Sequence, residues 1–286
     1  MASGSRERAS LCNISDTARW VAAHRAIETA RPDAIFRDPL AARLAGESGQ
    51  ALAETLHGRQ QASWPFVVRT YLIDRMISAQ VTAGVDLVIN IAAGLDTRPY
   101  RMALPKSLTW VEVDLPDLLS HKVEKLLGER PACKLDRVAC DLTDKASRRE
   151  LFAKLNARAR NVLVITEGLL IYSSDAEVTS LAGDLAWASA FRHWITDLVS
   201  PALLERLQRA FGRTLVDAKA PLKFGPPAGV TFFEPLGWKA VEVHSMLKTA
   251  ATLKRLPWYL KPYTLFRDKQ PPGRAMWSGV CLMERI

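Results

Sequence analysis

The sequence predicts an α/β fold with a doubly wound, mostly parallel sheet. Two nearly all-apolar runs, Asp86–Ala93 and Val162–Thr166, are typical of strands that are buried on both faces. Helical patterns lie between most of the predicted strands, and this alternation favours parallel strands joined by crossover helices. A Pro- and Gly-rich segment joins the last two predicted strands instead. It indicates a closing hairpin with one antiparallel edge strand.

Local patterns define the individual elements. The apolar residues of Leu115–Leu127 recur at helical spacing, and Pro116 suits a first helical turn. Ser174 and Glu177 have the spacing of a capping box, and Pro201 opens a further helix. Seven segments are predicted as strands: Asp86–Ala93, Thr109–Asp114, Arg137–Asp141, Val162–Thr166, His193–Val199, Lys239–His244 and Met276–Glu284.

The first 85 residues have helical patterns and no predicted strand. Helices are expected at Ser15–Thr29, Pro39–Ala45 and Trp64–Ala83, the last after a good start signal at Ser63. We therefore expect residues 1–85 to form a helical cap on the sheet of residues 86–286, within one structural unit.

Composition restricts the function classes. The chain has 286 residues, 48% of them hydrophobic, and no apolar run approaches the roughly 20 residues that span a bilayer. No secretory signal, paired cysteine spacing or zinc-ligand motif is present, which favours the cytoplasm and no metal. The net charge is +9, but the basic residues are dispersed and lack an aromatic platform. The charge therefore indicates either a solvated cationic surface or an anionic small-molecule partner, and it does not favour nucleic acid or membrane.

Distinctive residues follow the predicted strands, where ligands bind in open α/β sheets. Gly94 ends the first strand, and Asp114 lies 20 residues later (114 − 94) at the end of the second. Such a carboxylate accepts hydrogen bonds from both ribose hydroxyls of a nucleotide. The alternative for Asp114 is capping of the helix at Pro116. Leu115, beside the acid, is included in the predicted cofactor site.

The glycine content of the first turn restricts the ligand. A pyrophosphate needs a glycine-rich loop, but only Gly94 is present and Ala92 and Ala93 precede it. The turn therefore favours an adenosyl ligand without a pyrophosphate over NAD. Asp141 is positioned for the adenine amine, with the Leu142 N–H for a ring nitrogen. The alternative for Asp141 is a turn or N-cap aspartate.

Arg69 lies on an apolar face of its predicted helix, four residues before Ile73. A buried guanidinium needs an anionic partner, which the carboxylate of a bound amino-acid moiety would supply. The alternative is an arginine whose head reaches solvent.

The motifs together resemble the leucine carboxyl methyltransferase family. They read, in order, GLDTRPYRM, VEVDLPDLLSHK, CDLTD and TEGLLIYSSDAEV, and DTARWVAAHRAIETARPDAIFRDPLAARLAG resembles the bacterial branch with its polyketide O-methyltransferases. The resemblance spans most of the chain. It implies a Rossmann-like seven-stranded sheet with an inserted antiparallel last strand, and S-adenosyl-L-methionine (SAM) as cofactor.

The resemblance also implies roles for single residues. Arg69 holds the methionyl carboxylate, and Glu167 lies at the methionyl and methyl end. Tyr172 lies at the mouth of the substrate site. The cofactor set is then Arg69, Gly94, Asp114, Leu115, Asp141, Leu142 and Glu167. Family members often read GAG where this chain has Ala92-Ala93-Gly94, so an effect of Ala92 on the turn or on SAM affinity is expected.

The predicted activity is methyl transfer to an oxygen of a small-molecule acceptor. A carboxylate is ionised at neutral pH and needs no general base, whereas a hydroxyl would need one. Only weak candidates for a base or catalytic residue are present, namely Tyr172, His193 and His244, which favours a carboxylate. The alternatives are an NAD(P)-dependent oxidoreductase on a similar sheet and a non-catalytic SAM-binding module.

Two segments are left with open assignments. Lys219–Gly229 is either a mobile lid or an irregular crossover. The aromatic segment Thr231–Trp238 either lines the acceptor pocket or packs in the core.

Overall fold

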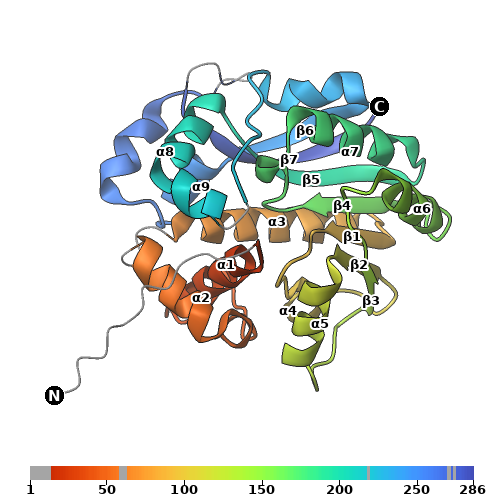
Figure 1. Cartoon of the computed structure of the whole chain (residues 1–286). Helices are drawn as coiled ribbons and strands as arrows, with labels where there is room; N and C mark the ends of the chain where they lie inside the picture. Colours follow the sequence, from red (N-terminus) through yellow and green to blue (C-terminus); the bar gives the residue numbers. More distant parts are fainter. Residues whose placement is uncertain (1–13, 58–62, 218–219, 269–271, 273–274) are drawn as a thin grey trace.

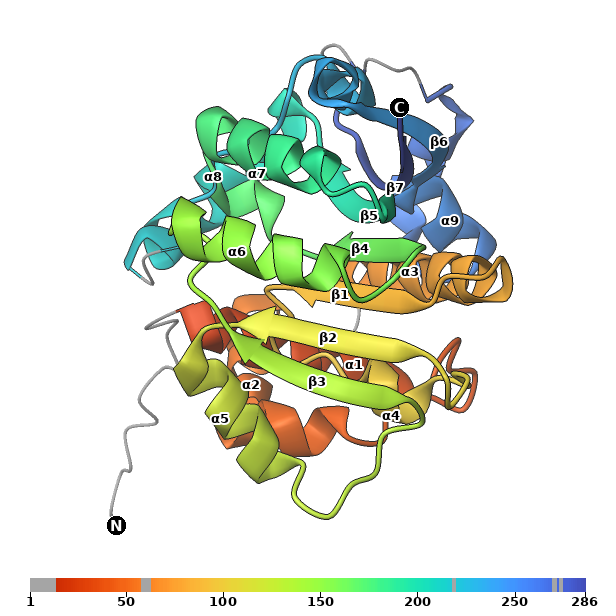
Figure 2. The ribbon, with the colours of Figure 1, turned by 90° about the vertical axis from the view of Figure 1, so that its right-hand side faces the viewer.

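The computed structural model describes residues 14–57, 63–217, 220–268, 272 and 275–286 (Figure 1). Within these ranges seven strands form one sheet in the order β3-β2-β1-β4-β5-β7-β6. Figure 2 shows the strands of this twisted sheet. The strands are β1 Leu87–Ile91, β2 Thr109–Asp114, β3 Lys134–Ala139, β4 Val162–Thr166, β5 Phe191–Val199, β6 Trp238–Ser245 and β7 Ser278–Arg285.

Strands β1 to β5 pair in parallel, and β7 is antiparallel to both β5 and β6. The predicted Rossmann-like sheet is confirmed, but the antiparallel strand is not at the edge as the tail suggested. It is inserted between β5 and β6, as the family resemblance implied. Gly279–Met283 of β7 are buried, whereas Val241 and Val243 of β6 are exposed. Burial on both faces suits the interior position, and β6 takes the edge.

The β3 prediction was displaced by three residues, because β3 begins at Lys134 rather than Arg137. This edge strand is mostly half-exposed and lacks the apolar run that identifies β1 and β4. Asp141 consequently lies two residues beyond the strand, in the following turn.

Helices cover both faces of the sheet. The capping box at Ser174 and Glu177 and the helix start at Pro201 are confirmed. The helices are α1 Ile14–Thr29, α2 Ala41–His57, α3 Trp64–Thr82, α4 Arg98–Arg101, α5 Pro116–Lys125, α6 Lys145–Asn156, α7 Asp175–Trp187, α8 Pro201–Asp217 and α9 Met246–Thr252, with 3-10 helices η2 Leu170–Tyr172, η3 Gly229–Leu236 and η4 Trp258–Leu265.

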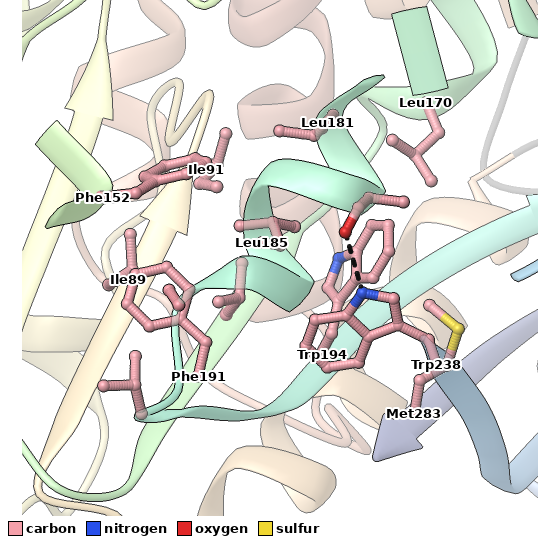
Figure 3. Close-up of a cluster of buried hydrophobic side chains, with 14 of the residues drawn as sticks. Ile89, Ile91, Phe152, Leu170, Leu181, Leu185, Phe191, Trp194, Trp238 and Met283 are labelled. Atoms are coloured by element: carbon pink, nitrogen blue, oxygen red, sulfur yellow. Dashed lines mark hydrogen bonds between the residues drawn. The ribbon is translucent and has the colours of Figure 1, made fainter. Parts of the chain in front are cut away.

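Successive strand residues pack into two different cores. Ile89 and Ile91 face α6 and α7, whereas Val88 faces α3 and α9, as the alternation of a strand requires. Figure 3 shows the first core, where the indole N–H of Trp238 donates to the carbonyl of Ala182 at 3.0 Å. The segment Thr231–Trp238 packs here, with Phe233 and Trp238 fully buried. The core alternative therefore describes it, and none of its residues lines the large cavity described below.

The described residues before β1 include the three helices α1, α2 and α3 (Figure 1). α3 packs against the sheet in the second core, whereas α1 and α2 form a third core with α5. α2 extends well beyond the predicted end at Ala45, across a kink at Gly46, whose φ is 59°. Glycine adopts this angle at little cost, so the chain passes through the kink and the helix continues. No helix in the described ranges is both long and apolar enough to cross a membrane.

One arginine joins the two ends of the chain. Arg255, after α9, donates from Nη2 to Glu28 in α1 at 2.8 Å and pairs from Nη1 with Asp33 at 3.0 Å. The Arg255 and Glu28 side chains are only 6% and 2% exposed. The segment that leads into η4 is thereby attached to the N-terminal helix.

Candidate functional site

A cavity of about 1250 Å³ lies at the carboxyl edge of the sheet. It is lined by α1, α3 and α8 and by the segments that follow β1, β2, β4 and β5. Five of the residues predicted from the sequence line it together: Arg69, Gly94, Asp114, Glu167 and Tyr172. The strand ends therefore meet at one site, as the edge rule for open α/β sheets requires.

Asp114 and Gly94 contact each other directly. The Gly94 N–H donates to Oδ2 of Asp114 at 2.7 Å, and the Leu115 N–H donates to Oδ1 at 2.7 Å. Burial raises the pKa of Asp114, and the two N–H groups oppose this shift. The carboxylate holds the turn after β1 rather than capping α5, whose N-cap is Leu115 without a side-chain cap bond. The Leu115 side chain is 45% exposed and lies outside the cavity lining.

The turn after β1 uses two left-handed residues. Gly94 has φ 51° and Ala92 has φ 54°. Ala92 occupies the position of the first glycine in the resembling motif. An L-residue in this region costs roughly 1–2 kcal/mol, so Ala92 adopts the glycine conformation under strain.

Arg69 is buried in the cavity wall and paired within the protein. Its Nε donates to Oε1 of Glu167 at 3.0 Å, and the side chain is 13% exposed. The alternative of an arginine whose head reaches solvent is therefore wrong for Arg69. Gly168 makes this approach possible, because a Cβ at this position would lie 3.1 Å from Nη1 of Arg69. The φ of Gly168 is 62°, in the left-handed region that favours glycine.

Asp197, at the end of β5, completes this pair and was not predicted. It accepts from Nη1 of Arg69 at 3.2 Å and from the Gly168 N–H at 2.6 Å, and it lines the cavity. The available signal was its place near the end of the predicted strand His193–Val199, the same rule that identified Asp114.

A second arginine, Arg98, links the first motif to the site and was also missed. It is 2% exposed, and its Nη1 donates to Glu167 at 2.8 Å and to Asp96 at 2.9 Å. Its Nε donates to Asp74 of α3 at 2.6 Å. Burial opposes the charge of Glu167, but Arg98 and Arg69 outweigh it and lower the pKa of that carboxyl. Glu167 is consequently ionised at neutral pH.

Asp141 and Leu142 lie outside the cavity lining. Asp141 is exposed, and its Oδ1 accepts the N–H of Thr143 at 2.9 Å and its hydroxyl at 2.8 Å. These are the contacts of the turn alternative. Leu142 is half-buried against the first core.

Of the three weak catalytic candidates, only Tyr172 lines the cavity. Burial raises its pKa, so its hydroxyl stays protonated. His193 has Glu284 at 4.0 Å, and His244 contacts Glu242 at 3.1 Å near the sheet edge. Among the described residues, the cavity lining contains no histidine.

The sequence profile of the leucine carboxyl methyltransferase family matches residues 18–186 of this chain. The chain belongs to the leucine carboxyl methyltransferase family. The predicted family is confirmed.

Relatives of this family member carry methyltransferase names. A Streptomyces avermitilis protein named "Putative S-adenosyl-L-methionine-dependent methyltransferase" is 31% identical over 94% of this chain and 96% of its own length. A Mycobacterium avium protein of the same name is 35% identical over 57% of this chain and 58% of its own. The chain thus matches less than two thirds of the latter relative.

Solved structures confirm the fold of this family member. A crystal structure titled "putative methyltransferase" from Thermobifida fusca has a TM-score of 0.61, 18% identity, and coverage of 96% of this chain and 94% of its own. A DUF574 family protein from Streptomyces avermitilis has a TM-score of 0.57, 15% identity, and coverage of 93% and 97%.

Proposed function

We propose that this protein transfers the methyl group of SAM to a carboxylate oxygen of a small anionic acceptor. The observation that carries the proposal is the pairing of Asp114 with the Gly94 N–H at 2.7 Å, in the same cavity as Arg69 and Glu167. A buried acid at the end of β2 and a left-handed turn after β1 suit a nucleoside ligand and do not form a pyrophosphate cradle.

The cofactor site fits the charges of SAM. We assign the ribose hydroxyls to Asp114 and the close backbone approach to Gly94. We assign the methionyl carboxylate of SAM to Arg69 and the methionyl ammonium group to Glu167. The two side chains form an ion pair, so the site offers both signs of charge. The adenine role of Asp141 and Leu142 stays a prediction.

The cavity favours an acceptor that ionises by itself. Bound SAM supplies an electrophilic methyl group, so the protein has to hold the acceptor oxygen in line and exclude water. Tyr172 keeps its proton and serves as a hydrogen-bond donor to the acceptor rather than as a base. With no histidine among the described lining residues, a carboxylate fits better than an alcohol.

The N-terminal helices supply part of this site. Trp20 and Val21 of α1, together with Arg69 of α3, line the cavity. We propose that residues 1–85 act as a cap on the cofactor edge of residues 86–286, as one structural unit.

Calorimetry with SAM, S-adenosylhomocysteine and NAD tests the cofactor half. We expect micromolar binding of S-adenosylhomocysteine that is lost in Asp114→Ala and retained in Asp136→Ala, whose carboxylate pairs with Arg158 on the surface. Tight NAD binding without a response to S-adenosylhomocysteine would instead indicate the oxidoreductase alternative.

Methyl transfer from labelled SAM into a cell extract tests the acceptor half. Base-labile label in a small-molecule fraction identifies a methyl ester. Base-stable label contradicts the carboxylate acceptor. Cofactor binding without any transfer to extract components would favour the non-catalytic SAM-binding module.

A further inference from the structure

We infer that the methyl acceptor is a bulky acid whose apolar body, a fused-ring system or a long chain, lies against η4 and the residues around it. This inference rests on the proposed function. The cavity is the first reason. Sites for one drug-sized ligand measure about 300–1,000 Å³, and this cavity of about 1250 Å³ has room for a second molecule beside the cofactor.

The two ends of the cavity differ in chemistry. The charged and polar lining residues Asn90, Asp96, Asp114, Glu167 and Asp197 lie at or just beyond the carboxyl ends of the strands. The lining residues of α8 include Leu203, Leu207 and Phe211, which are only partly buried. We call this side of the cavity, which α8 lines with three apolar side chains, the apolar chamber.

An aromatic wall of Tyr259, Tyr263 and Phe266 closes this chamber at η4. All three line the cavity, yet they are 51%, 53% and 70% exposed. Exposed rings at the wall of a cavity gain about 25 cal/mol for each Å² of apolar surface that a ligand covers. An acceptor with a large apolar body provides that cover, whereas a short polar acid leaves the rings in water.

Two cations of the lining match an acid. Arg206 and Arg267 both line the cavity and are exposed. Within the described ranges neither has a carboxylate partner, and Nη1 of Arg206 contacts Sδ of Met276 at 3.7 Å. In contrast, Asp268 is neutralised by Lys248 at 3.2 Å. The chamber therefore combines an apolar wall with uncompensated positive charge, the complement of an amphipathic acid.

The same segment provides matched controls. Trp258 and Leu265 are 77% and 85% exposed but do not line the cavity. Removing them takes away apolar surface from η4 without changing the wall. The wall and control variants change exposed side chains, so all four proteins are expected to melt within a few degrees of the wild type.

Calorimetry on protein saturated with S-adenosylhomocysteine tests the inference with 2-naphthoate, dodecanoate, acetate and succinate as probes. We expect the two bulky acids to bind and the two short acids not to bind. Tyr263→Ala and Phe266→Ala should weaken binding of the bulky acids roughly ten-fold, since each removes a ring that the bound acid would cover. Trp258→Ala and Leu265→Ala should leave their affinity unchanged.

The controls separate this inference from the proposed function. The affinity for S-adenosylhomocysteine should be unchanged in all four variants. If the wild type does not bind S-adenosylhomocysteine, the result contradicts the proposed cofactor site instead. The inference is overturned if short acids bind as tightly as bulky ones, if neither bulky acid binds, or if the wall variants bind them like wild type.

Discussion

The carboxylate of Asp197 accepts the backbone N–H of Gly168 at 2.6 Å. This bond joins the end of β5 to the turn after β4, and the second oxygen of Asp197 holds Arg69 at 3.2 Å. The turn therefore depends on a side chain 29 positions later. Two substitutions separate its two contacts.

Asp197→Asn retains an oxygen for the Gly168 N–H but removes the charge beside Arg69. Asp197→Ala removes both and leaves a buried donor unsatisfied, which costs about 1–3 kcal/mol. We expect urea unfolding to rank the free energies of unfolding as wild type, then Asn, then Ala. Equal stability of the two variants would show that the Gly168 bond contributes nothing.

Ala92→Gly is expected to stabilise the protein. The residue has φ 54°, and removing the left-handed strain of about 1–2 kcal/mol exceeds the entropy cost of glycine, about 0.5–1 kcal/mol. A rise of roughly 0.5–1 kcal/mol in the free energy of unfolding should be measurable with urea. Ala93→Gly is the control: its φ is not positive and its methyl is buried, so no strain is relieved and stability should fall. A fall in both variants would contradict the strain.

Glu167→Gln is expected to make stability less dependent on acid pH. The folded-state pKa of Glu167 lies below its ordinary value of 4.5, so its stabilisation is fully present above pH 4.5 and is lost as pH falls through the lowered value. The variant should lose about 1.5–3 kcal/mol at pH 7. Urea unfolding at pH 7 and at successively lower pH should show this difference closing. A constant difference across the series contradicts the prediction.

Two buried cysteines are expected to resist alkylation. Burial raises the pKa of Cys133 to about 11 and raises that of Cys281 further, and the thiolate is the reactive form. In a Cys12→Ser background, iodoacetamide at pH 8 should label neither residue in native protein and both in urea, as read by mass spectrometry of peptides. Labelling of Cys281 in native protein would show that its core opens.

What could be predicted from the sequence was local. Leu87–Ile91 and Val162–Thr166 have an uninterrupted apolar pattern, so β1, β4 and the edge that holds Gly94 followed directly. The partners of Arg98 could not be predicted, since Asp74 and Glu167 lie 24 and 69 positions away. The interior place of β7 followed from the family resemblance, whereas the pattern of the tail alone indicated an edge strand. The sequence did not decide between the adenine role and the turn role of Asp141, because β3 has no continuous apolar pattern that defines its end.

The Arg255–Glu28 contact bears on the order of folding. Its partners are 227 positions apart, so closing it carries the loop entropy of most of the chain. Native contacts of such long separation form slowly. The segment leading into η4 and the first helix both approach the cavity, which therefore acquires its walls only when the two ends meet. Neither half alone contains a complete ligand site, and ligand addition during refolding should accelerate no early phase.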